Sequence, residues 1–255
     1  MLEETRLHRI TALLSTLNQV STENIIQHLG VSRETVRRDV LKLEEQGKLK
    51  RVHGGIVSCA LEVEKPLEVR STLRKEEKRS IVRETVKQLK SGQTIFIDAG
   101  STTTMLAEEL LSMSGLTVIT NSLEIAKKLS SLPDQHEVIL LGGHMGRTAQ
   151  ATSGEITLNE LSKYRADVAI LSPVGLSDEA GASSFFHNEA AIASAMVKLA
   201  NKTIILADSK KLGVISRVVY AMPTEINTII TDCKIELNEV INKLRASGSD
   251  IIVSK

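Results

Sequence analysis

Apolar residues in the first part of the chain recur at helical spacing. The first stretch predicts a helix over residues 6–17, whose apolar positions are Leu7, Ile10, Leu13, Leu14 and Leu17. Ser21 is a candidate N-cap of a second helix, which we expect to end at Gly30. Ser32 is the candidate N-cap of a third helix. Two short helices separated by a glycine-containing turn predict a helix-turn-helix.

The third helix has an apolar face and a basic face. On a helical wheel Val36, Val40 and Leu43 cluster on one side, which predicts that this side packs on the preceding helices. The opposite side and its flanks carry Arg33, Glu34, Thr35, Arg37, Arg38 and Lys42. Two short alternating runs around Gly54-Gly55 then predict a β-hairpin over residues 49–57. A hairpin after a helix-turn-helix is the wing of a winged helix.

The outer face of the third helix predicts DNA binding. Arg38 is placed to donate two hydrogen bonds to a guanine, and Thr35 is a second candidate for base contacts. Arg37 and Lys42 point toward the groove walls and suit phosphates. The residues expected at the DNA are Ser21, Ser32, Arg33, Thr35, Arg37, Arg38, Lys42, Lys50, Arg51 and His53. The alternatives are a merely solvated basic face and, for His53, an exposed turn residue.

After residue 57 the pattern changes to short β-type runs that alternate with helical ones. Residues 58–73 contain Pro66 and predict a linker, and a charged helix is expected from Leu73 to Leu89. The charges of that helix are expected to lie on a solvated face, with a role in signal transmission left open. The predicted strands are Thr94–Asp98, Leu116–Thr120, Glu137–Leu141, Asp167–Ser172, Thr203–Asp208, Asn227–Thr231 and Ile251–Val253. This alternation predicts an α/β domain over residues 74–255 with a mainly parallel sheet, after a small winged helix-turn-helix domain over residues 1–57.

Small polar residues gather where these strands end. In parallel sheets, ligands bind beyond the carboxyl ends of the strands. A glycine followed by hydroxyls at a helix N-terminus, as in residues 98–103, suits an anion, although helix capping is the alternative. Lys211 is a candidate partner for a phosphate, and Asp98 or Asp208 for sugar hydroxyls. The residues expected at the ligand are Asp98, Gly100, Ser101, Thr102, Thr103, Asn121, Ser122, Gly142, Gly143, Gly175, Glu189, Asp208 and Lys211.

Composition narrows the class of protein. The chain of 255 residues is 42% hydrophobic and only 2% aromatic, so its core must be aliphatic. The net charge of +1 conceals a basic patch, because residues 33–51 hold seven Lys or Arg against four Asp or Glu. The two cysteines, Cys59 and Cys233, have no metal-like spacing and predict thiols in a reducing cytosol. We find no signal-peptide pattern, no apolar run long enough for a membrane span, and no pattern that calls for a metal or cofactor. A cytoplasmic protein is therefore expected.

The motifs together resemble a known family. Val31-Ser32, Thr35-Val36-Arg37-Arg38-Asp39, Leu43-Glu44, Gly47 and Arg51-Val52-His53-Gly54-Gly55 are similar to the N-terminal signature of the DeoR family of bacterial regulators. The resemblance continues in Glu77-Lys78-Arg79-Ser80-Ile81 and in the turns at residues 98–103, 120–122, 142–143, 153–154, 208–211 and 231–232, and at Glu189. It implies an operator-binding repressor whose sensor domain resembles sugar-phosphate isomerases of the ribose-5-phosphate type.

The same resemblance implies a ligand and an assembly. In the family a phosphorylated sugar or related metabolite binds the sensor domain and changes operator affinity, with the turn at Asp98–Thr103 taking the phosphate. Dimers or tetramers are expected, because a symmetric oligomer reads repeated half-sites. Two alternatives stay open: a sugar-phosphate isomerase-like enzyme, with Asp98, Glu189, Asp208 and Lys211 as its acid–base groups, and an RNA-binding or architectural winged helix.

This sequence departs from the family pattern at three places. After the fourth predicted strand it has residues 171–177 in place of a glycine-rich run that ends in an acidic residue. It has Ala193 where a lysine often stands four residues after Glu189. Phe185-Phe186-His187-Asn188 precedes Glu189, and we hypothesise that this cluster shapes effector selectivity, with packing of the phenylalanines as the alternative.

Overall fold

The computed structural model divides the chain into two compact units, Met1–Glu64 and Lys65–Lys255. It describes residues 2–17, 19–46, 48–52, 54–58, 65–132, 134–146, 150–233 and 239–254. Of the residues discussed above, Gly47, His53 and Cys59 lie outside these ranges.

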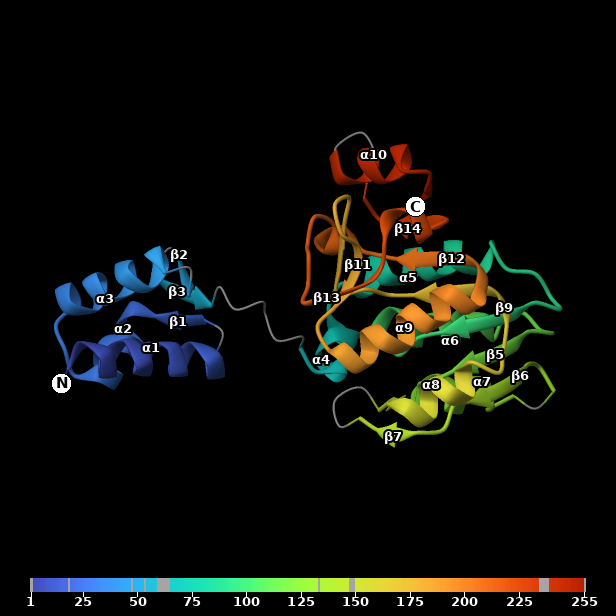
Figure 1. The fold of residues 1–255 in the computed structure, drawn as a ribbon, viewed down its shortest axis with the longest axis horizontal. Helices are drawn as coiled ribbons and strands as arrows, with labels where there is room; N and C mark the ends of the chain where they lie inside the picture. The colour runs from blue at the N-terminus through green and yellow to red at the C-terminus, as the bar shows by residue number, and fades with distance from the viewer. Residues whose placement is uncertain are drawn as a thin grey trace. The chain divides into compact units, whose positions relative to one another are not determined.

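The first unit contains three helices and a small antiparallel sheet (Figure 1). Its elements are α1 (Glu3–Leu17), β1 (Gln19–Ser21), α2 (Thr22–Leu29), α3 (Arg33–Glu45), β2 (Leu49–Val52) and β3 (Gly55–Ser58). The predicted caps are confirmed: the Ser21 hydroxyl accepts from the Asn24 N–H, and the Ser32 hydroxyl from the Thr35 N–H. Gly30 ends α2 with φ +63°, a left-handed conformation that favours glycine. The helix-turn-helix and its wing are therefore present as predicted.

A third strand closes the wing sheet. The strand order is β1-β3-β2, and Ser21, the last residue of β1, pairs with Gly55 of β3. A side chain at Gly55 would collide with the backbone oxygen of Val20, so only glycine permits this close approach of the two strands. β1 was not predicted, because three residues between two helices give no alternating pattern.

The core of the first unit is aliphatic, with a partly buried ion pair beside it. Val36, Val40 and Leu43 of α3 are buried with Ile10 and Ile25, as the wheel predicts. Asp39 is also buried, at 4% exposure, although it lies among charged residues in the sequence. Its carboxylate binds the Arg6 guanidinium through Nε–Oδ2 at 2.6 Å and Nη2–Oδ1 at 3.0 Å. This bidentate pair joins α1 to α3.

The second unit is built on a seven-stranded parallel sheet. Its order is β15-β14-β12-β9-β4-β5-β6, and every neighbouring pair is parallel. The strands are β4 (Thr94–Ile97), β5 (Thr117–Thr120), β6 (Glu137–Leu140), β9 (Ala166–Leu171), β12 (Ala200–Leu206), β14 (Thr228–Thr231) and β15 (Asp250–Val253). All seven predicted strands are thus confirmed as members of one sheet.

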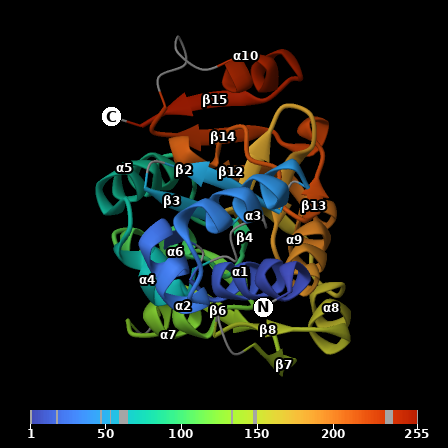
Figure 2. The same cartoon turned by 90° about the vertical axis from the view of Figure 1, so that its left-hand side faces the viewer.

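Helices cover both faces of this sheet. They are α4 (Leu67–Thr72), α5 (Lys75–Val86), α6 (Ser101–Leu110), α7 (Leu123–Leu129), α8 (Glu155–Leu161), α9 (His187–Leu199) and α10 (Glu239–Ala246). One apolar cluster buries the inner faces of α5, α6 and α7 against Ile95 and Ile97 of β4. The other buries α8, α9 and α10 against Phe96, the β4 residue that points the opposite way. Figure 2 shows α5 and α7 on one side of the strands, and α8 and α9 on the other.

Smaller elements complete the second unit. A three-stranded antiparallel sheet has the order β10-β11-β13, and β7 pairs with β8. The bounds are β7 (His144–Met145), β8 (Thr152–Ser153), β10 (Gly175–Ser177), β11 (Gly181–Ser184) and β13 (Val218–Ala221), with single 3-10 turns η1 (Ser209–Lys211) and η2 (Pro223–Glu225). None of these strands was predicted. In the described ranges, no helix combines the length and the apolar character that crossing a membrane requires.

The Arg6–Asp39 pair predicts a measurable stability effect. Asp39→Asn removes the carboxylate that binds Arg6, and we expect the first unit to lose stability, because the buried side chain at position 39 then has no charge to pair with the half-buried guanidinium. Hydrogen exchange of the α1 and α3 amides in the full chain measures this loss. Glu23→Gln is the matched control, because the Arg33–Glu23 pair is well exposed on both sides and should contribute less than about 1 kcal/mol. Equal losses in the two variants would contradict the role of Asp39.

Candidate DNA-binding and ligand-binding sites

A groove of about 810 Å³ lies between α3 and the wing of the first unit. It is lined by Thr22, Arg33, Glu34, Val36, Arg37, Val40, Arg51, Val52, Gly54, Gly55 and Ile56. Three of the predicted DNA contacts, Arg33, Arg37 and Arg51, therefore share one concave surface. Their guanidinium groups suit phosphate oxygens, which accept hydrogen bonds in the planar geometry that arginine provides.

Most basic side chains at this surface have an acidic neighbour. Arg33 lies 3.4 Å from Glu23, Arg37 3.8 Å from Glu34, and Arg51 2.7 Å from Glu44. Lys42 binds Glu3 of α1. These exposed pairs are weak in water, so they can exchange for phosphates at little cost. The Arg51–Glu44 pair has an additional contact, because Glu44 also accepts a hydrogen bond from the backbone N–H of Arg51 at 2.9 Å.

Arg38 differs from the other basic residues of α3. It is exposed and makes no ion pair or hydrogen bond with the described part of the chain. Lys50 is exposed as well. By contrast, the hydroxyls of Ser21 and Ser32 act as helix caps, and the Thr35 hydroxyl lies 2.9 Å from that of Ser32. The structure therefore leaves Arg38 readily available for base contacts, while Thr35 already has a local partner.

In the second unit the chain reverses its direction across the sheet beside β4. From β4 it proceeds outward through β5 to β6, then returns to β9 on the other side of β4 and continues to β12, β14 and β15. The two strands that flank the reversal are β4 and β9. In open α/β sheets such a point leaves a crevice at the carboxyl ends of the strands, where ligands bind.

Predicted ligand residues meet at this reversal. Asp98 follows β4, and its Oδ2 accepts from the backbone N–H of Ser172, which follows β9, at 3.2 Å. The Ser172 hydroxyl accepts from Lys211 Nζ at 2.8 Å. Oδ1 of Asp98 is buried and has no hydrogen-bond partner among the described residues, so a ligand hydroxyl there would satisfy it. Asp98 and Lys211 are thus connected through Ser172, which was not predicted from the sequence. These three residues form one cluster.

The first turn of α6 lies beside this cluster. Ser101, Thr102 and Thr103 are all buried, and the N-cap Gly100 supplies no side-chain acceptor. Thr103 instead donates to the Gly100 carbonyl at 3.1 Å. The backbone N–H groups of the first turn have no acceptor in the described ranges, so this helix end offers donors and a positive dipole end to an anion.

The remaining predicted residues have structural partners. Ser122 caps α7 by accepting from the Ile125 N–H, and Asn121 donates to the Thr152 carbonyl at 2.9 Å. The Gly142 carbonyl accepts from Thr157 at 2.8 Å, and Gly143 has φ +144°. Gly175 lies so close to the Val214 backbone that a Cβ would collide with it. The ends of β5 and β6, which carry the first four of these residues, are one and two strands away from β4.

Two acidic residues line the same region with different partners. Asp208 caps the turn η1 by accepting from the Lys210 N–H at 3.1 Å, and it lies 3.0 Å from Arg74 Nε. Glu189 accepts from the Ser184 hydroxyl at 3.3 Å, and its charge raises the pKa of Asp98. Phe185 beside it is buried under Arg217, whose guanidinium carbon lies 4.0 Å from the ring centre. Packing therefore accounts for Phe185, while Phe186 remains exposed.

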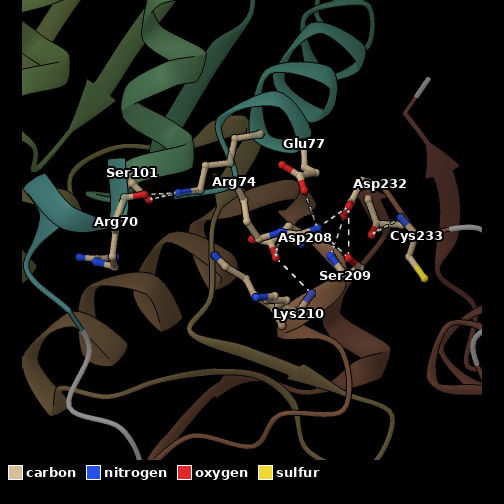
Figure 3. Close-up of polar contacts among 12 residues, drawn as sticks. Arg70, Arg74, Glu77, Ser101, Asp208, Ser209, Lys210, Asp232 and Cys233 are labelled. Carbon is tan, nitrogen blue, oxygen red and sulfur yellow. Dashed lines mark hydrogen bonds and ion pairs between the residues drawn. The ribbon is translucent and has the colours of Figure 1, made fainter. Parts of the chain in front are cut away.

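Sequence reasoning missed the basic residues before β4. Arg74 reaches Asp208, Asp232 and Ser209 (Figure 3). Lys78 reaches Ser101. Lys78 is buried at 4% exposure, so the expectation that the charges of α5 lie on a solvated face is wrong for this residue. A signal was present, since Lys78 precedes Ile81, Val82 and Thr85 at the three-, four- and seven-residue spacing of one helical face. Among the described residues, no group of acidic, histidine or cysteine side chains is placed to hold a metal ion.

Comparisons with known proteins match both units. The model of the DeoR-like helix-turn-helix domain matches residues 6–61, and that of the DeoR C-terminal sensor domain matches residues 73–233. The chain is 31% identical over 232 residues to the glycerol-3-phosphate regulon repressor of Escherichia coli strain K12, covering 91% of this chain and 92% of that one. It is 32% identical over 256 residues to the transcriptional repressor GlcR of Bacillus subtilis strain 168, covering 100% and 98%. It is 35% identical over 230 residues to the lactose phosphotransferase system repressor of Staphylococcus epidermidis, covering 89% and 91%.

Solved structures give weaker similarities. A ribose 5-phosphate isomerase from Methanocaldococcus jannaschii matches with a TM-score of 0.39 and 18% identity, covering 54% of each chain. The sorbitol operon regulator SorC from Klebsiella pneumoniae matches with a TM-score of 0.37 and 13% identity, covering 80% of this chain and 88% of that one. Likenesses at this level do not indicate a shared site or activity.

The buried carboxyl of Asp98 predicts a pH-dependent stability. Burial raises its pKa to about 7, although the Ser172 N–H, the Lys211 charge and the Thr103 hydroxyl oppose the rise. Because the folded pKa exceeds the ordinary value of 3.8, the folded state binds this proton more tightly. The resulting stability is fully present below about pH 4 and is lost as the pH rises to about 7.

We therefore compare Asp98→Asn with the wild type by thermal unfolding between pH 5 and pH 8. The variant should gain stability relative to the wild type as the pH rises, by roughly 2–3 kcal/mol over this range. Asp250→Asn, which changes an exposed carboxyl, should show no such gain. If the stabilities of Asp98→Asn and the wild type change with pH in the same way, the pKa of Asp98 is not raised by folding.

Proposed function

This chain belongs to the DeoR family of transcription regulators, and we propose that it represses a carbohydrate-metabolism operon under the control of a phosphorylated sugar or related anionic metabolite. The arrangement that carries the proposal is the Asp98–Ser172–Lys211 cluster at the reversal between β4 and β9. With the first turn of α6 beside it, this cluster offers a carboxylate, a hydroxyl, an ammonium and a helix N-terminus to one small ligand. The names of the matched repressors, which refer to glycerol-3-phosphate and to lactose phosphotransferase, support the same class of effector.

The cluster divides into an end for an anion and an end for hydroxyl groups. The first turn of α6 and Lys211 provide donors and positive charge for a phosphate or a carboxylate. Asp98 and Glu189, together with Asp208, accept hydrogen bonds from sugar hydroxyls when ionised. A polyhydroxylated anion of a few carbons fits this division, whereas a neutral sugar would leave the positive end unbalanced.

The first unit contacts operator DNA in this proposal. Arg38 at the outer face of α3 reads a guanine, and Arg33, Arg37 and Arg51 in the groove between α3 and the wing bind phosphates. Lys50 and Lys42 add phosphate contacts, the latter after leaving Glu3. We infer a cytoplasmic homo-oligomer, because a symmetric assembly reads two half-sites of an operator.

Effector and operator act on each other through one free energy of coupling. An effector that weakens operator binding must itself bind less tightly to the DNA-bound protein, by the same factor. A tenfold change in operator affinity requires about 1.4 kcal/mol of coupling. The isomerase alternative is not supported, since the matched relatives are named repressors and the chain carries the helix-turn-helix of that family.

The assignment of Arg38 to base contacts is testable. Arg38→Ala should relax base preference at one operator position and cost about 1–3 kcal/mol with the preferred base. Selection of binding sequences by the full chain, followed by affinity measurements on single-base variants, gives both quantities. Lys50→Ala is the control for a phosphate contact and should weaken all sequences about equally, with a shallower salt dependence. A uniform loss in Arg38→Ala would contradict its role in base recognition.

The assignment of Asp98 to the effector is tested with the same operator. A thermal-shift screen of phosphorylated sugars and sugar acids identifies a binder, since a ligand of the folded state raises the melting temperature. Asp98→Ala should bind operator DNA like the wild type and should lose the change in affinity that this binder causes. If Asp98→Ala binds operator DNA much more weakly than the wild type when no effector is present, Asp98 has a structural role. A screen in which no phosphorylated compound alters operator affinity would overturn the proposed effector class.

A further inference from the structure

Tyr220 carries a buried hydroxyl group without a hydrogen-bond partner. It lies in β13, and the residue is only 5% exposed. The hydroxyl oxygen is buried, and no donor or acceptor of the described residues lies within hydrogen-bond distance of it. A buried polar group usually has a partner, because leaving it unpaired costs free energy. The side chains packed around Tyr220 are apolar and would accept a phenylalanine equally well, so packing alone does not explain the hydroxyl.

The small antiparallel sheet is irregular at Tyr220. In the pairing of β11 with β13, Ala182 lies opposite Ala221. The next residue of β11, Ser183, lies opposite Val219. Tyr220 is therefore the extra residue of a β-bulge. Bulges redirect a side chain and are frequent next to binding sites. In agreement with the bulge, Tyr220 and Ala221 are both buried, although successive side chains of a regular strand point to opposite faces.

The hydroxyl of Tyr220 lies near the ligand cluster at the reversal of the main sheet. β13 packs against α9, as Figure 2 shows on one side of the main sheet. Tyr220 belongs to the apolar cluster that contains Leu171, the residue directly before Ser172. Burial raises the pKa of the Tyr220 hydroxyl well above its ordinary value, and the charge of Asp98 raises it further. The hydroxyl therefore keeps its proton at neutral pH and is available as a donor close to Asp98.

Tyr220 and Asp98 offer complementary groups to a ligand. Oδ1 of Asp98 is also buried and has no hydrogen-bond partner among the described residues. A protonated phenol donates one hydrogen bond, whereas an ionised carboxylate only accepts. An alcohol group satisfies both, because its oxygen accepts from Tyr220 while its hydrogen is donated to Asp98. A carbonyl oxygen, an ester oxygen or a methylene group cannot do both.

We propose that Tyr220 and Asp98 together bind one hydroxyl group of the effector, and that Tyr220 thereby selects a hydroxylated effector over analogues that lack this group. The inference rests on the proposed function and adds to it a residue outside the predicted ligand set. Tyr220 recognises the sugar part of the effector, so its contribution is separate from the binding of the anion. A site built to pair with a hydroxyl discriminates against the analogue without it, since the polar groups of the site then stay unpaired.

Tyr220→Phe tests the proposal, because it removes only the hydroxyl group. Binding to the full chain is measured by isothermal titration calorimetry with three phosphate esters: glycerol 3-phosphate, ribose 5-phosphate and glucose 6-phosphate. Inorganic phosphate is the fourth probe and has no alcohol group. The ester that binds the wild type most tightly should bind Tyr220→Phe roughly tenfold more weakly, because Asp98 alone then pairs with its hydroxyl. Inorganic phosphate should show no difference between the two proteins.

Tyr164→Phe is the matched control. Tyr164 is the other tyrosine of the chain and lies just before β9, at the edge of the sheet opposite the carboxyl ends of the strands. This variant should bind the same ester like the wild type.

The outcomes separate the inference from the proposed function. Equal affinity of Tyr220→Phe and the wild type for the tightest ester would overturn the inference. An equal loss for the ester and for inorganic phosphate would also overturn it, since the anion would then be the group affected. A wild type that binds none of the three esters would contradict the phosphorylated effector of the proposed function, and the inference would fall with it.

The free protein gives a second readout that needs no ligand. Removing a buried hydroxyl without a partner relieves its cost, so Tyr220→Phe should raise the melting temperature of the second unit by roughly 2–4 °C. A lower melting temperature would show that the hydroxyl already has a partner within the protein, and it would overturn the proposal. Higher stability without ligand, together with weaker binding of the ester, is the combination that a role in ligand binding predicts and a purely structural role does not.

Discussion

The second unit depends on one constraint, that all seven strands of its main sheet run parallel. Their carboxyl ends must then lie at a single edge, and the side chains that follow them must share it. Because the chain reverses direction beside β4, the residues after β4 and β9 face each other, and this places Asp98 opposite Ser172. The segment before β4 adds the cations. Residues from the sequence range 70–211 thus reach one site without any long functional loop.

The two units use positive charge in different ways. In the first unit the arginines are exposed and paired with glutamates on the surface, so they exchange partners readily in water. In the second unit Lys78 is removed from water, and its hydrogen-bond acceptors in the described ranges, the Arg70 carbonyl and the Ser101 hydroxyl, are neutral. Exposed pairs favour fast and salt-sensitive binding to a long polyanion. A buried cation favours discrimination, because only an anion of the right size can enter and compensate it.

Local pattern was enough to predict the winged helix and the seven main strands. The caps at Ser21 and Ser32 and the apolar side of α3 follow from residues a few positions apart, which is where sequence patterns are informative. Strand order does not follow from such patterns, since pairing joins residues far apart in the chain. The antiparallel strands β10 and β11 were missed because glycines and serines there give no apolar alternation. Lys78 and Asp39 were missed because a charged residue was taken as exposed, although each lies at an apolar position of its helix.

Gly55 has a consequence for how the first unit meets its target. Because no side chain separates β3 from β1, the wing is paired along its length with the strand that leads directly into α2. The wing and the helix-turn-helix are therefore parts of one rigid sheet-and-helix body before any contact is made. Such preorganisation lowers the conformational entropy lost on association, so more of the contact energy appears as affinity. The absence of a side chain at Gly55 thus reduces the entropy that the first unit loses when it binds its target.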